Sequence, residues 1–289
     1  MFVCDTVNMY KYNLDTKLIE GSVNLKCQAN SIYVRDGYLY VASNYISIDD
    51  YYEDDNYRGT ITKIKLDDFT IDKQVDVNCY PYSIFVDNRG DIIVGKGRDQ
   101  WINFSKIDLE TGNITDLFQG YHQDYLIYSE EKDAFLSITQ SISSDNSWYK
   151  YYENQGYDNH EYKSGCSINS LSYVYKNGEV LIESSYWSNR IYVSKFDSDI
   201  NDYVSKEFTI PSFDIRFTKF VSTYEDNKVY FVGTPESGNV GVSGVIDLET
   251  ENVSCSYIKL KTLNVDSIHV YNDLLYVAYL DSKILDVFN

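Results

Sequence analysis

The sequence predicts an all-β fold built from repeated four-stranded antiparallel sheets, and three observations lead to this prediction. A strand–turn–strand pattern recurs along the 289 residues, most clearly at residues 105–114 (SKIDLETGNI) and 244–253 (GVIDLETENV). Six copies are spaced 43 to 52 residues apart, and their equivalent positions are Lys11, Lys63, Lys106, Lys150, Lys195 and Val245. No long stretch follows the 3.6-residue period of an amphipathic helix. A repeat of this length is typical of one β-propeller blade.

A second pattern precedes most copies of the first. It consists of two short apolar runs joined by a turn of Asp, Asn and Gly, and is clearest at residues 31–42, 83–95 and 267–278. β-branched and aromatic residues around such a turn indicate a β-hairpin. The runs are apolar on both faces, as expected for the two strands nearest the axis of a propeller. The two patterns together supply the four strands of one blade.

Six blades close the ring most simply, because the step from the last copy round to the first resembles the other steps. The closing blade then joins strand 267–271 to strands 9–14 and 18–25, so that the N- and C-terminal strands lock the ring. Three further stretches also have strand character: 2–6, 275–279 and 284–288. Seven blades with incomplete first and last blades are therefore the alternative. Residues 1–289 are expected to form a single domain.

The composition is that of a soluble globular protein with an acidic surface. Hydrophobic residues make up 43% and aromatic residues 16% of the chain, and 44 acidic against 25 basic residues give a net charge of −19. This charge disfavours nucleic acid and anionic membranes as partners. A strongly charged surface also favours a monomer, despite the 30 tyrosines. A cationic partner or a divalent cation would suit the same charge.

The cysteines and the N-terminal residues indicate the cellular compartment of the protein. Five cysteines are scattered without a C-x-x-C pair, which indicates free thiols in a reducing compartment. Residues 1–5 lack the basic and apolar regions of a signal peptide, and no apolar run reaches the roughly 18 residues of a membrane span. We expect a cytoplasmic protein. The alternative is an extracellular protein whose signal was removed before residue 1.

At this point the chain resembles a known family. The segments Tyr40-Val41-Ala42-Ser43 and 242–250 (VSGVIDLET) are similar to the YVTN-type β-propeller repeat, which pairs a "YVTN" strand with a "VSVIDTxT" strand and turn. NHL-like and quinoprotein-like repeats share this pattern. The resemblance covers nearly the whole chain and implies a propeller, but it implies no chemistry. The equivalent second strands here read YVAS, IVGK and YVAY, and no quinone or tungsten motif accompanies them, so no cofactor is expected.

Two long connections are candidates for binding. The first, residues 44–59, carries five carboxylates within seven residues: Asp49, Asp50, Glu53, Asp54 and Asp55. Carboxylate oxygens are ligands for Ca²⁺, although the spacing matches no EF-hand loop. A solvated acidic loop is the alternative interpretation.

The second candidate is rich in aromatic residues, namely Trp148, Tyr149, Tyr151, Tyr152 and Tyr157. Exposed aromatic rings stack on sugars or anchor protein partners. In the alternative, these side chains pack between blades.

His269 is the remaining candidate, because it falls in a predicted strand that lines the channel of a propeller. No second histidine occupies an equivalent position, and the chain has neither a G-x-S-x-G elbow nor a glycine-rich phosphate loop. We therefore expect a non-enzymatic module that presents its acidic and tyrosine-rich loops to a protein or glycan. The alternative is a propeller-type lyase or lactonase-like hydrolase with a divalent metal at the channel mouth.

Melting curves of Trp148→Ala and Tyr151→Ala distinguish the two interpretations of the aromatic segment. Truncation of exposed anchors changes the free energy of unfolding by under about 0.5 kcal/mol. Truncation of packed rings lowers it by about 3–5 kcal/mol. We expect the smaller effect for the ring that faces solvent. Losses on the larger scale in both variants would rule out a binding face here.

Overall fold

The computed structural model consists of strands and turns throughout the residues that it describes. No helix suitable for crossing a membrane occurs in that part of the chain. The described residues are 1–5, 7–45, 58–96, 103–119, 125–129, 134–138, 148–153, 160–164, 170–175, 180–185, 188–197, 202–211, 216–279 and 284–288.

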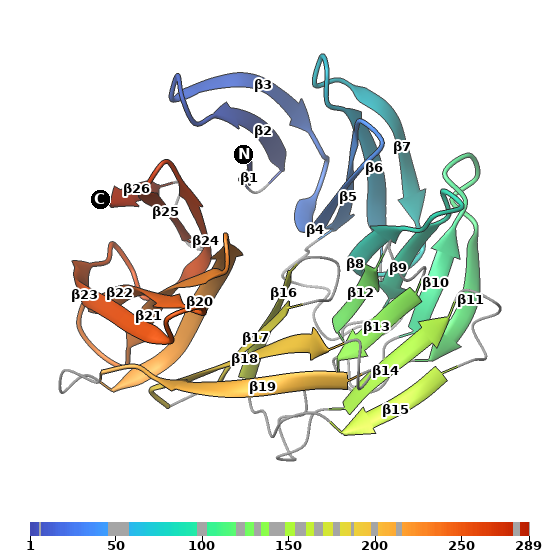
Figure 1. Cartoon of the computed structure of the whole chain (residues 1–289). Coiled ribbons are helices and arrows are strands. Elements are labelled where there is room, and N and C mark those ends of the chain that lie inside the picture. Colours follow the sequence, from blue (N-terminus) through green and yellow to red (C-terminus); the bar gives the residue numbers. More distant parts are fainter. Residues whose placement is uncertain are drawn as a thin grey trace. The chain divides into compact units, whose positions relative to one another are not determined.

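Contacts divide the chain into two compact units. Unit 1 comprises Met1–Thr139 and Tyr149–Tyr162, and unit 2 comprises Gln140–Trp148 and Lys163–Asn289. Both consist of antiparallel sheets whose strands pair in chain order (Figure 1). The expectation of one domain over residues 1–289 stays a prediction.

Unit 1 contains the first four sheets except Trp148, Lys163 and Ser164, which belong to unit 2. The first sheet has three strands, β1 (Phe2–Cys4), β2 (Asn8–Asn13) and β3 (Leu18–Asn24). The second sheet has β4 (Gln28–Arg35), β5 (Tyr38–Asn44), β6 (Gly59–Lys65) and β7 (Ile71–Val77). The third has β8 (Pro81–Val86), β9 (Ile92–Lys96), β10 (Asn103–Ile107) and β11 (Ile114–Gln119). The fourth has β12 (Tyr125–Ser129), β13 (Ala134–Ile138), β14 (Trp148–Glu153) and β15 (His160–Ser164).

Unit 2 contains the remaining sheets. The fifth sheet has β16 (Ser170–Tyr175), β17 (Val180–Ser185), β18 (Arg190–Asp197) and β19 (Asp202–Thr209). The sixth has β20 (Phe217–Glu225), β21 (Lys228–Pro235), β22 (Val240–Asp247) and β23 (Asn252–Lys259). The seventh has three strands, β24 (Val265–Tyr271), β25 (Leu274–Tyr279) and β26 (Leu285–Phe288). The predicted all-β fold of consecutive antiparallel sheets is confirmed.

The described strands form seven sheets, as in the seven-blade alternative. Strands 9–14 and 18–25 were expected to share a sheet with 267–271. Instead β2 pairs with both β1 and β3, while β24 pairs with β25. The physical reason is that each terminal region supplies its own second strand. A neighbouring strand along the chain closes a short loop, which has a smaller entropic cost than a distant partner.

In the second and seventh sheets, a short turn of residues with positive φ joins the first strand to the second and forms a hairpin. Asp36 and Gly37 join β4 to β5 with φ values of 48° and 78°. Asn272 and Asp273 join β24 to β25 with φ values of 49° and 61°. Two consecutive positive φ values are typical of type I′ turns, whose twist matches the strands. The hairpins predicted at these two turns are therefore confirmed.

The acidic turn of the recurring pattern is fixed by its first aspartate. Oδ1 of Asp108 accepts the backbone N–H of Glu110 at 2.7 Å. Oδ1 of Asp247 accepts the N–H groups of Glu249 and Thr250 at 3.0 and 2.9 Å. Such local bonds are why aspartate is favoured at the start of a turn.

An acidic residue in each of these turns connects neighbouring sheets. Glu110, between β10 and β11, forms an ion pair with Lys73 of β7 in the preceding sheet. Glu251, before β23, forms the same kind of pair with Lys206 of β19. These pairs are exposed and each stabilises by at most about 1 kcal/mol. Glu251 stands where the other copy has Gly112, so the two ion pairs arise from different positions of the turn.

Apolar layers fill the spaces between successive sheets within each unit. Representative residues of the layers are Met9, Leu25, Leu39 and Val41 between the first and second sheets; Tyr40, Ile61, Ile84 and Val94 between the second and third; Ile182, Ile191, Phe220 and Phe231 between the fifth and sixth; and Val221, Val232, Ile268 and Val277 between the sixth and seventh. Alternate residues of one strand therefore enter different layers. A sheet is stabilised on each face by a different neighbour.

Gly244 of β22 tests how closely these sheets pack. A Cβ at this position would lie 2.5 Å from Cζ of Phe231 and 2.5 Å from the carbonyl oxygen of Ser254. We expect Gly244→Ala to lower the free energy of unfolding by about 1–3 kcal/mol through overpacking.

The matched control is Gly238→Asn, measured by urea denaturation beside the parent. Gly238 has a φ of 82° and nothing within 4 Å of an added Cβ. Asparagine tolerates this conformation, so the loss should stay below about 1 kcal/mol. Equal stability of Gly244→Ala and the parent would contradict the close packing.

Candidate functional site

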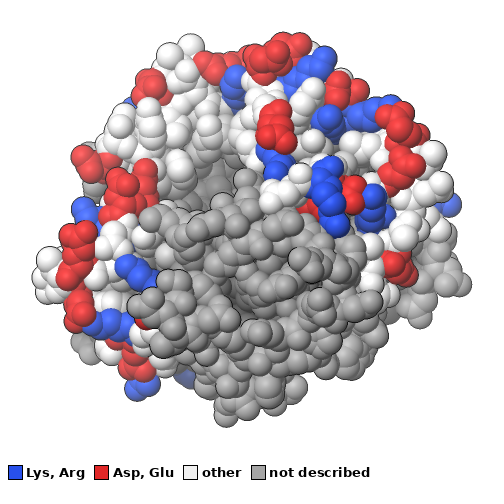
Figure 2. All heavy atoms as spheres, turned by 45° about the vertical axis from the view of Figure 1, so that its right-hand side comes forward, with Lys and Arg blue, Asp and Glu red and all other residues white. Residues whose placement is uncertain are grey.

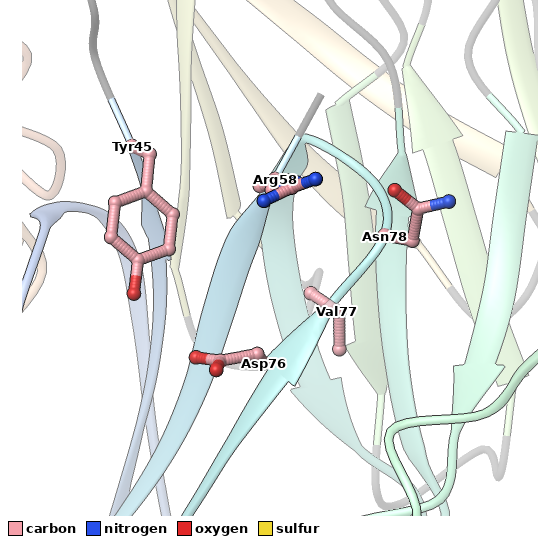
Figure 3. A pocket seen from close by; sticks show the side chains of 5 residues that line it. All are labelled: Tyr45, Arg58, Asp76, Val77 and Asn78. Atoms are coloured by element: carbon pink, nitrogen blue, oxygen red, sulfur yellow. The ribbon is translucent and has the colours of Figure 1, made fainter. Parts of the chain in front are cut away.

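A hollow of about 380 Å³ lies at one end of the second sheet. Its lining residues are Tyr45, Arg58, Asp76, Val77 and Asn78. Figure 3 shows Tyr45 on one side and Asn78 on the other, with Arg58, Asp76 and Val77 between them. All five are at the ends of β5, β6 and β7 or directly beyond them. Strand pairing therefore holds the hollow in place.

Backbone pairing continues one step past the strands at this end. The N–H of Tyr45 donates to the carbonyl oxygen of Arg58 at 3.1 Å. These two residues are the described ends of the long connection that the sequence marks as an insertion. The hollow therefore lies where residues 46–57 leave and rejoin the sheet.

Tyr45 offers both an apolar ring and a hydroxyl donor. The side chain is exposed. Desolvation, with a further contribution from the negative charge of Asp76, raises the pKa of Tyr45 above its ordinary value. The phenol is therefore protonated at neutral pH. A protonated phenol can donate a hydrogen bond to a ligand oxygen while its ring stacks on an apolar or sugar face.

Arg58 supplies positive charge in an acidic protein. Its guanidinium has five N–H donors and stays charged at any physiological pH. No ion pair among the described residues involves Arg58, whereas Asp76 has Lys26 at 4.0 Å. The hollow thus combines an available cation with the exposed carboxylate of Asp76 and the amide of Asn78. These groups suit a ligand with several hydroxyl, amide or carboxylate groups.

Asn44, the residue before Tyr45, is the most unusual polar group at this strand end. It is fully buried, and neither Nδ2 nor Oδ1 has a hydrogen-bond partner among the described residues. Ser43 is equally buried, and its Oγ has no partner in the part of the chain that the structure describes. Buried polar groups are nearly always hydrogen-bonded in proteins, and leaving one unpaired costs about 1–3 kcal/mol. Two adjacent unsatisfied residues of β5 indicate a place where buried water supplies the partners.

Some of the candidate residues predicted from the sequence lie among the described residues, and others do not. Asp49, Asp50, Glu53, Asp54 and Asp55 lie outside the described residues, as does Tyr157. The others of the aromatic set, Trp148, Tyr149, Tyr151 and Tyr152, are in β14, where Tyr149 pairs with Ile138 and Tyr151 with Leu136. The binding roles of both sets stay predictions.

His269 is in β24, the first strand of the seventh sheet, as expected. Its side chain is on the exposed side of the strand, between buried Ile268 and Val270. Desolvation lowers the pKa of His269 below its ordinary value of 6.5, and the negative charge of Glu225 opposes this shift. The imidazole is therefore largely neutral at pH 7 and can accept or donate a hydrogen bond.

Lys219 of β20 is a second polar group on the inner strands of unit 2. Its Nζ donates to the carbonyl oxygen of Val265 at 2.7 Å. Desolvation lowers its pKa, and the charge of Asp266 opposes this. Across the described ranges no three His, Cys, Asp or Glu side chains are placed to hold a metal ion.

Charges of both signs are interspersed on the surface. On the face shown in Figure 2, acidic and basic side chains alternate across the described residues without a continuous basic patch. A nucleic-acid interface would require such a patch.

No protein-family model and no curated protein sequence matches the chain. Solved structures resemble it. The periplasmic gluconolactonase of Pseudomonas aeruginosa is 10% identical with a TM-score of 0.69, over 97% of this chain and 87% of that one. The Dos1 propeller is 12% identical with a TM-score of 0.56, over 93% and 70%. BamB from Moraxella catarrhalis is 9% identical with a TM-score of 0.56, over 99% and 92%.

The fold is a β-propeller. The succession of three- and four-stranded antiparallel sheets and these solved structures agree on it. At such low identity the likeness concerns the fold alone, because propellers host many unrelated functions.

Sequence reasoning found the connection but missed the hollow beside it. The long insertion at residues 44–59 was the available signal. Its carboxylates were the predicted ligands, whereas the lining comes from Tyr45 and Arg58 at its ends and from Asp76 and Asn78 around the next strand end. Residues 76 and 78 are 17 or more positions away from the insertion, so only the strand pairing brings them together.

The pKa of His269 predicts a dependence of stability on pH. The folded pKa is lower than the unfolded value, so the unfolded state binds more protons at acidic pH. Stability is full above about pH 6.5 and declines as the pH falls below it. Between pH 7 and 5 the melting temperature of the parent should therefore fall more than that of His269→Gln. Parallel pH profiles for the two proteins would show that this histidine titrates normally.

Proposed function

We propose that this β-propeller is a non-enzymatic binding module that holds a protein or glycan partner at the hollow next to Tyr45 and Arg58. Its repeats belong, in this proposal, to the YVTN/NHL-like group. The supporting observation is the composition of the hollow: an exposed tyrosine, an arginine without an ion pair among the described residues, and an amide, all at paired strand ends. Tyrosine and arginine are the residue types most enriched at binding hot spots.

The geometry suits a ligand that is partly apolar and partly polar. A volume of about 380 Å³ falls within the range of small-ligand sites. A sugar ring or a peptide side chain can stack on Tyr45, while Arg58 and Asn78 donate hydrogen bonds and Asp76 accepts them. Rigid strand ends reduce the entropy that such a site loses on binding.

Arrays of immobilised glycans and synthetic peptides test the proposal with the parent, Tyr45→Ala and Arg58→Ala. We expect at least one class of probe to bind the parent and to lose about tenfold or more in affinity with either variant. Both side chains are exposed, so the free energy of unfolding should change by under about 0.5 kcal/mol.

Tyr257→Ala is the matched control, because this tyrosine is also exposed but is in β23 of unit 2. Its array profile should equal that of the parent. Probes that bind all four proteins equally would place the binding surface elsewhere and refute the role of the hollow.

The second candidate is a lactonase-like hydrolase, favoured by the fold shared with the gluconolactonase and by the exposed, largely neutral His269 on an inner strand. A neutral imidazole can act as a general base. Glucono-δ-lactone hydrolysis, followed with the parent and His269→Gln in the presence and absence of added divalent metal, tests it. Turnover that exceeds the spontaneous rate and is lost in His269→Gln would replace the binding proposal.

A further inference from the structure

The polar side chains that line the hollow fall into two groups. Asp76 has a partner, because Lys26 lies 4.0 Å away. The charge of Asp76 also acts on Tyr45, whose pKa is raised by desolvation first and by Asp76 second. The side chains of Arg58 and Asn78, by contrast, have no hydrogen bond or ion pair with any residue that the structure describes. The groups still available to a ligand are therefore a guanidinium and an amide, both of which donate hydrogen bonds.

These two donors are set apart from the carboxylate. Figure 3 shows the guanidinium of Arg58 and the amide of Asn78 in the upper part of the view, and the carboxylate of Asp76 below them. Both donors are exposed, and Asp76 forms its ion pair with Lys26 rather than with Arg58. A ligand group that reaches Arg58 therefore gains most if it is an acceptor with negative charge.

The backbone at this end of the second sheet is already paired within the sheet. The N–H of Tyr45 donates to the carbonyl oxygen of Arg58 at 3.1 Å, and Asp76 pairs with Thr60 of β6. An extended peptide thus finds no free backbone groups between these strand ends, so side chains alone determine recognition. A volume of about 380 Å³ is near the lower end of the range for small-ligand sites. This favours a single ring over a peptide segment.

We propose that the ligand of the hollow is a sugar acid, namely a hexuronate residue of a glycan. Arg58 binds its carboxylate through two parallel N–H donors, because the planar guanidinium matches the geometry of a carboxylate. The sugar ring stacks on Tyr45, and Asn78 donates to a ring hydroxyl. This inference rests on the proposed binding function and narrows its ligand to one chemical class.

The charge of the whole chain limits how acidic this ligand can be. A net charge of −19 repels polyanions over long range. A phosphate group carries about −1.5 to −2 charges, whereas a carboxylate carries one. The best match is therefore an isolated uronate in an otherwise neutral glycan, held by the local charge of Arg58.

Three small glycosides test the role of the carboxylate: methyl β-glucuronide, its neutral methyl ester and methyl β-glucoside. Their dissociation constants are measured by ligand-observed NMR titration with the parent protein. We expect the glucuronide to bind about tenfold or more tightly than the ester and the glucoside, because only its carboxylate pairs with Arg58. Equal binding of the glucuronide and the ester would overturn the proposal.

Substitutions of the arginine test where the carboxylate binds. Arg58→Gln should bind the glucuronide no better than the ester, and Arg58→Lys should keep part of the preference, because lysine retains the charge but not the fork. The matched control is Arg190→Gln, which removes an exposed arginine of β18 that pairs with Glu207. This control should keep the full preference of the parent. A preference that persists in Arg58→Gln would overturn the assignment.

A variant without the acidic residues beside Arg58 tests whether the chain itself supplies the carboxylate. In this variant the acids of the insertion become amides: Asp49→Asn, Asp50→Asn, Glu53→Gln, Asp54→Asn and Asp55→Asn. We expect its dissociation constant for the glucuronide to lie within about threefold of the parent value. Binding by this variant but not by the parent would mean that the chain's own carboxylates hold Arg58, and would overturn the proposal.

The remaining outcomes separate this inference from the proposed function. Equal binding of all three glycosides, weakened in Tyr45→Ala, would overturn the sugar acid and leave the hollow as a binding site. Tighter binding of acetyl-Gly-Glu-Gly-amide than of the glucuronide would assign the carboxylate to a protein partner and overturn the glycan. Absence of any probe whose binding depends on Tyr45 or Arg58 would refute both the inference and the proposed function.

Discussion

A β-sheet of this protein cannot bury both of its faces by itself, and the other features follow from that constraint. Alternate side chains of each strand enter different apolar layers, so Tyr40 packs on the third sheet while Leu39 and Val41 pack on the first. Every sheet needs the same apolar strands to meet its neighbours, so the strand pattern recurs at regular spacing along the sequence. The ion pair between Lys73 and the acidic turn at Glu110 lies outside the apolar layer and adds little energy, but it favours one alignment of neighbouring sheets.

The architecture was predictable for the same reason, whereas the number of sheets was not. Hairpins and acidic turns are encoded locally, so residues 105–114 and 244–253 were recognisable as strand, turn and strand. Pairing of the terminal strands depends on which sheet edges are free. Residues 2–6 and 275–279 both have the pattern of the second strand of a blade. Local pairing resolves this in favour of separate first and seventh sheets. The number of repeats in the sequence does not determine the number of sheets, because the first and last copies of the repeat are incomplete.

Prediction of the site was limited by a different cause. An insertion of uncommon length identifies a strand end at which variation has little effect on the scaffold. It does not identify the side chains that meet there: Asp76 and Asn78 approach Tyr45 only through the pairing of β5, β6 and β7. Burial of Asn44 without a partner is likewise a property of packing. Its sequence neighbours give no sign of it, since asparagine at a strand end is ordinary turn chemistry.

The hollow is formed by side chains that strand pairing positions but does not depend on. Tyr45 directly follows β5 and Arg58 directly precedes β6, and both are exposed. Their replacement removes the ring and the cation from the hollow while the pairing of β5, β6 and β7 is kept. The lining of such a hollow can therefore vary without loss of the fold, because variation at strand ends has little effect on the scaffold.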